Sequence, residues 1–461
     1  MTRVLRRGLR ATAAGCAAAL VMSPAAWAIV PPTVDPETPP PAGNTGPAAP
    51  MQQQGDCITT GVLPGSDPAA ASPNQRMLNL EGAWRFSRGE GQTVAVIDTG
   101  VKPGPRLPDV EAGGDYVANG DGLTDCDGHG TLVAGIIAGK PADGDAFSGV
   151  APEARIIAIR QTSPRYSPRT TGGDPVLEHA VVDIASLARA VVRAADLGAR
   201  VINISSATCL PAGSDVDQSA LGAALRYAAV DKDAVIVAAA GNAGPNGIAG
   251  GQACHSNPLG GSINPEDPRN WAAASALSTP SWWQPYVLSV GSLTSGGQPS
   301  EFTMSGPWVG IAAPGENIVS LSNGEGGLAN GVPTDRGQMT TISGTSFATA
   351  YVSGVAALLR SRFPEMPANQ VIQRLTRTAH NGARDPSNLV GAGTLDPVAA
   401  LTWELPPPPP GAPEATQIAA PVVAPPENHT PRNIAFAGTA ALALAVAATA
   451  YAAHRRKERS Q

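Results

Sequence analysis

Short apolar runs alternate with segments of helical periodicity between residues 76 and 404. Five runs rich in β-branched residues predict buried strands, at 93–97, 156–159, 201–204, 235–239 and 287–290. Five longer segments predict helices, at 130–139, 176–197, 218–230, 346–363 and 368–378. Strands that are apolar throughout and separated by helices indicate a mostly parallel sheet covered on both faces. We therefore predict one large α/β domain with three layers.

The two ends of the chain carry apolar runs of another kind. Residues 1–28 begin with arginines up to Arg10, continue through an uncharged run, and close on the small-x-small site Ala26-Trp27-Ala28. This order predicts a secretory signal peptide, with a short buried helix as the alternative. Residues 434–453 contain no charge and, at about 1.5 Å per residue, would span ~30 Å as a helix. They predict one C-terminal transmembrane helix, with an alanine-rich soluble helix as the alternative.

Basic residues follow the second run and predict how the chain is oriented. The tail at 454–461 contains Arg455, Arg456, Lys457 and Arg459. Because basic flanks stay in the cytoplasm, this tail should be cytoplasmic and the body should lie outside. A signal peptide at the other end gives the same orientation. The sequence thus predicts a single-pass protein of the cell membrane with an extracytoplasmic domain.

Two proline-rich segments flank the domain. Residues 29–75 begin with Pro, Gly, Ala and Gln and few bulky apolar residues, which predicts an extended N-terminal arm. Residues 405–433 include five consecutive prolines from Pro406 to Pro410, which predicts a semi-rigid stalk. The predicted order is therefore signal, arm, domain at 76–404, stalk, membrane helix and tail.

Charge is distributed unevenly along the chain. Lys and Arg number 31 and Asp and Glu 37, a formal net charge of −6. Eight of the basic residues lie in the first ten and last seven positions, so the residues between carry about −13. Proteins that bind nucleic acid present a basic face, and this acidic body argues against such a partner.

Four cysteines remain after the predicted signal peptide: Cys57, Cys126, Cys209 and Cys254. An even number in an exported domain predicts two disulfides. Three pairings are possible, and spacing does not choose between them.

Asp98 ends a predicted strand and is followed by Thr99-Gly100. Ligand sites in parallel α/β sheets gather at the carboxyl ends of strands. Alone, such an aspartate is more often a turn or cap residue. Aspartic proteases share the Asp-Thr-Gly triplet but need two such carboxylates, and this chain has no second copy.

His129 and Ser346 each stand at the start of a predicted helix. His129 lies between two glycines, and Ser346 follows Gly344-Thr345. Separately, they fit a turn histidine and a helix cap. Together with Asp98 they supply a nucleophile, a base and a carboxylate that orients the base. An α/β-hydrolase would need the order Ser, acid, His, but the chain order is Asp98, His129, Ser346.

The motifs Asp98-Thr99-Gly100, His129-Gly130-Thr131 and Gly344-Thr345-Ser346, in this order along the chain, resemble those of the subtilisin family of serine proteases. Smaller matches are Gly149-Val150-Ala151-Pro152, Ala312-Ala313-Pro314-Gly315 and Ala240-Gly241-Asn242-Ala243-Gly244. The resemblance implies a subtilisin-like fold, a triad of Asp98, His129 and Ser346, and Asn242 as the side-chain donor of the oxyanion hole. Two features depart from the family. Leu132 replaces a usual second histidine, and Ser206-Ala207-Thr208-Cys209 replaces a glycine-rich pocket wall, which puts broad digestive specificity in doubt.

The signal peptide, arm, stalk and membrane helix resemble, more narrowly, the mycosins, the membrane-anchored proteases of type VII secretion systems. This resemblance implies disulfides Cys57–Cys126 and Cys209–Cys254, exported protein substrates and a partner in the secretion membrane complex. We expect no cofactor. Calcium would need an acidic loop with ligand spacing, and Asp115, Asp121, Asp125 and Asp127 are interpreted instead as a solvated loop. Two alternative functions are those of a mainly structural component of the secretion complex and of a freely secreted degradative subtilase.

Overall fold

The computed structural model describes most of the chain: residues 29–169, 174–244, 254–259, 264–284, 286–325, 327–334, 336–382, 387–406 and 430–458. The predicted signal peptide, most of the stalk and the last three residues lie outside the described residues. The chain divides into two compact units between Glu404 and Leu405. The first holds the α/β domain and the arm, and the second holds helix α10, Thr430–Glu458.

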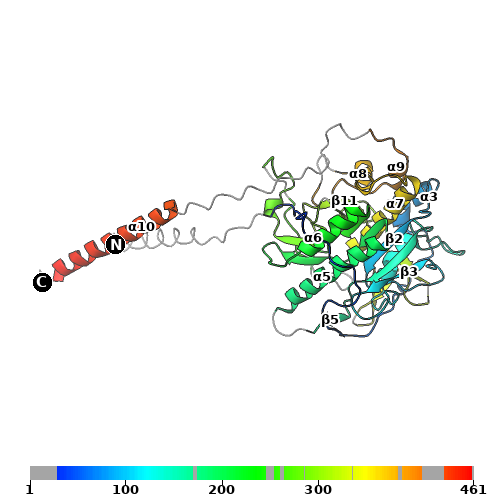
Figure 1. Ribbon diagram of the computed structural model, residues 1–461, viewed down its shortest axis with the longest axis horizontal. Coiled ribbons are helices and arrows are strands. Elements are labelled where there is room, and N and C mark those ends of the chain that lie inside the picture. The colour runs from blue at the N-terminus through cyan, green and yellow to red at the C-terminus, as the bar shows by residue number, and fades with distance from the viewer. Residues whose placement is uncertain are drawn as a thin grey trace. The chain divides into compact units, whose positions relative to one another are not determined.

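A seven-stranded sheet forms the middle layer of the first unit (Figure 1). Its strands, in spatial order, are β11 (Val309–Pro314), β10 (Val287–Leu293), β8 (Val235–Ala239), β6 (Val201–Ile204), β2 (Thr93–Asp98), β4 (Arg155–Arg160) and β3 (Val110–Asp115). Every pairing between neighbours is parallel. All strand carboxyl ends therefore meet at one edge of the sheet.

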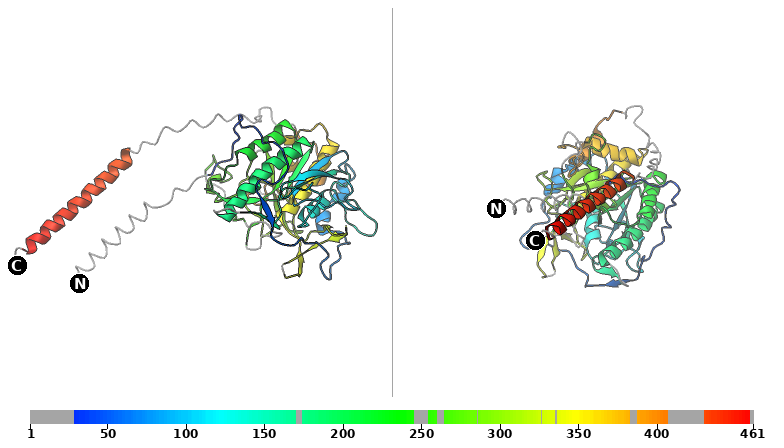
Figure 2. Two further views of the ribbon diagram at one scale, coloured as in Figure 1. Left: turned by 60° about the horizontal axis from the view of Figure 1, so that its bottom comes forward. Right: turned by 90° about the vertical axis from the view of Figure 1, so that its left-hand side faces the viewer.

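Helices cover both faces of this sheet (Figures 1 and 2). Helices α5 (Pro175–Asp196) and α6 (Ser219–Arg226) pack on one face, and α4 (His129–Ala138), α7 (Thr345–Arg362) and α8 (Ala368–Thr378) pack on the other. Side chains of β2 alternate between the two layers: Val94 and Val96 join the core of α4 and α7, whereas Ala95 and Ile97 join that of α5. This double burial explains why the strands are apolar throughout.

The predicted α/β architecture is confirmed, and each predicted strand and helix is found within a few residues of its expected bounds. Strands β3 and β11 were missed because both contain glycine and little β-branched sequence. Helix 218–230 is split, since α6 ends at Arg226 and a π-helical segment follows at Tyr227–Asp231.

Shorter elements border the sheet. They are β1 (Met51–Gln53), β5 (Tyr166–Pro168), β7 (Thr208–Pro211), β9 (Ala276–Thr279), β12 (Ser320–Leu321), β13 (Leu328–Ala329), β14 (Gly331–Pro333), β15 (Met339–Thr341), α2 (Pro73–Met77), α3 (Leu80–Ala83), α9 (Pro397–Thr402) and a 3₁₀ turn at Trp271–Ala273. In the arm, β1 pairs antiparallel with β5, and the Thr60 backbone N–H donates to the Asn323 side chain at 3.0 Å. The arm is therefore bonded to the α/β domain at separate points.

Helix α10 contains the predicted membrane run at 434–453. Among the described residues, no helix meets the combined requirements of length and apolar character for crossing a membrane. The transmembrane helix stays a prediction from the sequence.

Candidate active site

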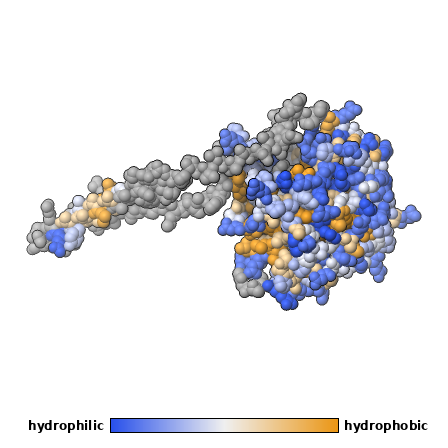
Figure 3. All heavy atoms as spheres, viewed as in Figure 1, coloured by the Kyte–Doolittle hydropathy of each residue, from blue (hydrophilic) through white to orange (hydrophobic). Residues whose placement is uncertain are grey.

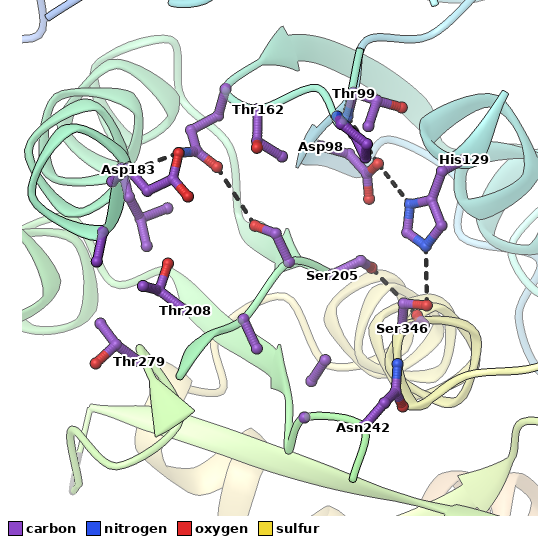
Figure 4. Close-up of a pocket in the computed structure, with 18 of the residues that line it drawn as sticks. Asp98, Thr99, His129, Thr162, Asp183, Ser205, Thr208, Asn242, Thr279 and Ser346 are labelled. Atoms are coloured by element: carbon purple, nitrogen blue, oxygen red, sulfur yellow. Dashed lines mark hydrogen bonds and ion pairs between the residues drawn. The ribbon is translucent and has the colours of Figure 1, made fainter. Parts of the chain in front are cut away.

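Asp98, His129 and Ser346 come from three different elements and meet at one point (Figure 4). Asp98 is the last residue of β2, His129 the first of α4, and Ser346 lies in the first turn of α7. His129 Nδ1 lies 2.7 Å from Asp98 Oδ1, and His129 Nε2 lies 2.9 Å from Ser346 Oγ. The three side chains form a continuous hydrogen-bonded line.

The glycines around His129 allow this close approach. Gly128 precedes α4 with φ of 74°, a left-handed conformation that glycine adopts without steric cost. A Cβ on Gly130 would collide with the carbonyl oxygen of Gly100 and would lie 3.2 Å from the Asp98 Cβ. The turn after β2 and the start of α4 can therefore pack directly on each other, and the imidazole reaches Asp98.

Burial and hydrogen bonds fix the Asp98 carboxylate. Its side chain is 1% exposed, and Oδ1 also accepts from the Thr99 backbone N–H at 2.7 Å. Its other oxygen, Oδ2, is buried and has no hydrogen-bond partner among the described residues. An ionised carboxylate that is only partly satisfied favours a positive charge on its neighbour, here His129.

Electrostatics around His129 favour its protonated form. Burial acts to lower the pKa of His129, and the charge and hydrogen bond of Asp98 act to raise it. The charges of Asp125 and Asp127 act in the same direction, so the pKa of His129 is raised above its ordinary value. The imidazole can thus accept a proton from Ser346 and hold it as an imidazolium beside three carboxylates.

The acidic loop before His129 corrects an expectation. Asp115, Asp125 and Asp127 were interpreted with Asp121 as a solvated loop, but all three are buried and only Asp121 is exposed. They are buried because each accepts hydrogen bonds from backbone N–H groups or hydroxyls of the loop and its neighbours. Sequence alone did not reveal this burial, since two of the donors, Thr99 to Asp125 and Ser163 to Asp127, lie far away in the sequence.

Asp125 accepts more hydrogen bonds than Asp115 or Asp127. Its Oδ1 accepts from the Thr99 hydroxyl at 2.9 Å and the Gly128 N–H at 2.8 Å. Thr99 Oγ1 in turn accepts from the Gly130 N–H at 2.9 Å. Burial raises the pKa of Asp125 to about 6, opposed by its hydrogen bonds to Thr131. This carboxylate joins the turn after β2 to the start of α4.

Asn242 follows β8 and faces Ser346 (Figure 4). Its Oδ1 accepts from both the backbone N–H and the hydroxyl of Thr345, each at 3.0 Å. These two bonds leave the Asn242 amide N–H₂ free to donate, beside the first-turn N–H groups of α7. The arrangement can stabilise negative charge next to Ser346 Oγ.

A cavity of about 410 Å³ extends from the three residues across the carboxyl ends of β4 and β6 towards α5. Segments 161–164 and 205–208 line it, with α5 beyond them. The Ser205 hydroxyl donates to the Ser346 carbonyl oxygen at 3.1 Å, which ties one wall to α7. None of the lining residues comes from the arm at 29–75. The described part of the arm therefore leaves this cavity open.

Two disulfides are present, Cys57–Cys126 and Cys209–Cys254, which confirms the pairing implied by the resemblance. The first attaches the arm to the loop that precedes His129. The second connects β7 to the segment after Asn242, where Cys254 lines the cavity. Both disulfides thus lie next to elements that carry the site.

Metal-ligating side chains do not gather in the part of the chain that the structure describes: no three His, Cys, Asp or Glu residues are placed to hold an ion there. The expectation of a protease without a cofactor stays a prediction.

Comparison with known proteins gives consistent matches. The model of the subtilase family, Peptidase_S8, matches residues 89–393. Mycosin-3 of Mycobacterium tuberculosis is 62% identical over 459 residues, covering 98% of this chain and 99% of the relative. The solved MycP3 protease from the type VII (ESX-3) secretion system is 66% identical with a TM-score of 0.78, covering 82% of this chain and 100% of that one. A chain of the intact ESX-5 inner membrane complex is 47% identical with a TM-score of 0.78, covering 91% and 99%.

Proposed function

This chain belongs to the subtilase family of serine proteases, and within it to the mycosins, and we propose that it cleaves selected exported proteins in support of a type VII secretion system. The observation that carries this proposal is the line of contacts from Asp98 through His129 to Ser346. That line supplies the three roles that acyl transfer requires.

In the proposed reaction, Ser346 Oγ attacks the scissile carbonyl carbon while His129 Nε2 takes its proton. Asp98 holds Nδ1–H of the imidazole, orients the ring and stabilises the imidazolium. His129 then gives the proton to the leaving amine, and a water molecule activated by the same imidazole hydrolyses the acyl-enzyme. The serine proton thus passes to the amine, and the enzyme returns to its starting state.

The tetrahedral intermediate carries an oxyanion. Asn242 Nδ2 and the Ser346 backbone N–H are the proposed donors. Thr345 supports this role because it fixes the orientation of the Asn242 amide through two hydrogen bonds. Donors that are already oriented need no rearrangement when the charge develops.

A fluorophosphonate probe tests the activity on the purified full-length chain. We expect covalent labelling of Ser346, located by mass spectrometry, and none in Ser346→Ala. Ser343→Ala is the matched control, since Ser343 lies three residues earlier, before α7 and outside the cavity, and should leave labelling unchanged. A folded chain that resists the probe would contradict the proposal.

The proposed location is the outer side of the cell membrane, with residues 434–453 as a single-pass anchor and 454–461 in the cytoplasm. The apolar run, the basic tail and the solved relatives support it, since one relative was solved in the periplasmic assembly of the ESX-5 inner membrane complex. Fractionation tests it: the chain should stay with membranes in high salt and be released by detergent. Recovery in the medium would favour a freely secreted subtilase instead.

A second candidate function is mainly structural. Relatives have been solved within an intact secretion membrane complex, which supports a role in holding such a complex together. The test compares deletion of the chain with Ser346→Ala. If secretion survives in the alanine variant but not in the deletion, the structural role is the principal one.

A further inference from the structure

Asp183 lies at the end of the cavity opposite the triad (Figure 4). It belongs to α5, whose residues Val176, Ala180, Asp183 and Leu187 recur at helical spacing and line the cavity together. Asp183 is the one carboxylate on this lining face. Nothing in the triad chemistry uses it.

The Asp183 carboxylate has a histidine, rather than a lysine or arginine, as its ion-pair partner. Its recorded ion-pair partner is His179 Nε2, one turn earlier, at 3.4 Å, and its side chain is 21% exposed. No Lys or Arg is among the residues that line the cavity. Burial raises the pKa of Asp183 to about 6, opposed by His179, so the group is mostly ionised at neutral pH. The cavity therefore holds an anion without a permanent cation beside it.

Hydrogen bonds fix the position of Asp183 relative to the triad. The Gln161 side-chain amide donates to the Asp183 carbonyl oxygen at 3.1 Å and to the Ser186 hydroxyl at 2.9 Å. The Gln161 backbone N–H donates to the Asp98 carbonyl oxygen at 2.8 Å. Gln161 thus bonds both to the strand that carries the triad aspartate and to the turn of α5 that carries Asp183, so the distance between the two carboxylates is fixed by the fold.

The surroundings of Asp183 suit a long aliphatic stem. Val176, Ala180 and Leu187 line the same part of the cavity. Val176 is also half exposed, and apolar side chains gather over the N-terminal part of α5, at the lower left of the face in Figure 3. Lys and Arg side chains pack their methylenes on apolar surface while the charged end reaches a polar partner.

We propose that Asp183 forms a specificity site that binds a lysine or arginine side chain of the protein substrate. This inference rests on the proposed protease function and names a preference of that same cleft. The cation would lie against the Asp183 carboxylate, and its methylenes would cover Val176 and Ala180. An apolar side chain there would exclude water from the Asp183 carboxylate without supplying a charge to pair with it, and an acidic one would add a like charge, so both are disfavoured.

Peptidyl phosphonates test the proposal without requiring turnover. A set carrying lysine or norleucine at each position in turn is reacted with the full-length chain, and the labelling rate at Ser346 is measured. We expect a preference for lysine of about ten- to a hundredfold at one position, as for a hydrogen-bonded charge pair. Asp183→Asn should remove most of that preference, because asparagine has nearly the same shape but carries no negative charge to attract the lysine.

Asp174→Asn is the matched control, because it removes one negative charge from the same helix outside the cavity. Asp174 caps α5 by accepting from the Val176 N–H at 2.9 Å, and asparagine caps helices equally well. It should keep the lysine preference. If the wild-type chain reacts with phosphonates but shows no basic preference at any position, or if Asp183→Asn retains it, the inference is overturned and the protease function stands. If no phosphonate or fluorophosphonate reacts, the protease function itself fails.

Discussion

Asp125 Oδ2 accepts two hydrogen bonds from Thr131, one from its backbone N–H at 2.8 Å and one from its hydroxyl at 2.6 Å. Thr131 belongs to the first turn of α4, so a buried carboxylate holds the N-terminus of the helix that begins with His129. The same charge contributes to the raised pKa of His129. Asp125 is therefore a positioning residue, close to the triad but outside the line of proton transfer.

We expect Asp125→Asn to shift the pH dependence of reaction with fluorophosphonate. Removing this negative charge lowers the pKa of His129, so the imidazole stays neutral to lower pH. The acid limb of the rate profile should therefore shift to lower pH. The labelling rate measured from pH 4 to pH 9 checks this. Asp121→Asn is the control, because Asp121 is in the same loop but exposed, and its profile should not move. A shift of the acid limb to higher pH in Asp125→Asn would contradict the electrostatic argument.

Asp125 also predicts a component of the pH dependence of stability. Its pKa is about 6 in the folded chain, above the ~3.9 expected when unfolded. Between these values the folded state binds more protons than the unfolded state, so this group adds stability as the pH falls from 7 towards 4. We expect the melting temperature of the wild-type chain to change more favourably from pH 7 to pH 5 than that of Asp125→Asn, which has no carboxyl group to protonate at this position. Melting curves at pH 7 and pH 5, in detergent, measure this difference. An equal change in melting temperature between the two pH values in both proteins would refute the prediction.

Much of the site could be predicted because its members stand at the ends of elements with strong local patterns. Asp98 ends an apolar strand, and His129 and Ser346 begin helices, so short motifs reveal them. Asp183 lacks such a pattern, since it stands inside an ordinary amphipathic helix. Its importance appears only when the fold brings α5 beside the carboxyl ends of β4 and β6.

The strands of the sheet likewise differ in how well the sequence predicts them. The buried central strands could be predicted because each is a run of mostly apolar and β-branched residues. Strand β3 lies at the edge of the sheet and has the sequence Val-Glu-Ala-Gly-Gly-Asp. Its pairing with β4 stabilises it, and that pairing is not local in sequence.

The disulfide Cys57–Cys126 gives a prediction about the arm. Cys126 lies between Asp125 and Asp127, so the bond attaches the arm to the loop that positions His129. We expect Cys57→Ser to lower the free energy of unfolding by about 2–4 kcal/mol and to slow labelling of Ser346. Denaturant titration of the full-length chain measures the first effect. Cys126→Ser and the double variant should match it, because each breaks the same bond, and additive losses would refute this account.

The oxyanion hole gives the last prediction, which separates the donor from the residue that orients it. Asn242→Ala removes the proposed side-chain donor and should lower kcat by about 10²–10³-fold with little change in KM, because the oxyanion exists only in the transition state. Thr345→Val keeps the backbone N–H bond to Asn242 Oδ1 and removes the hydroxyl bond, so the amide loses one of its two restraints. We expect a smaller loss, about tenfold or less, and Thr345→Ser should restore most of it. Steady-state kinetics measure both losses, with a peptide substrate that has the same sequence as the fastest-reacting phosphonate. An equal loss in Asn242→Ala and Thr345→Val would mean that Thr345 acts on Ser346 directly rather than through Asn242.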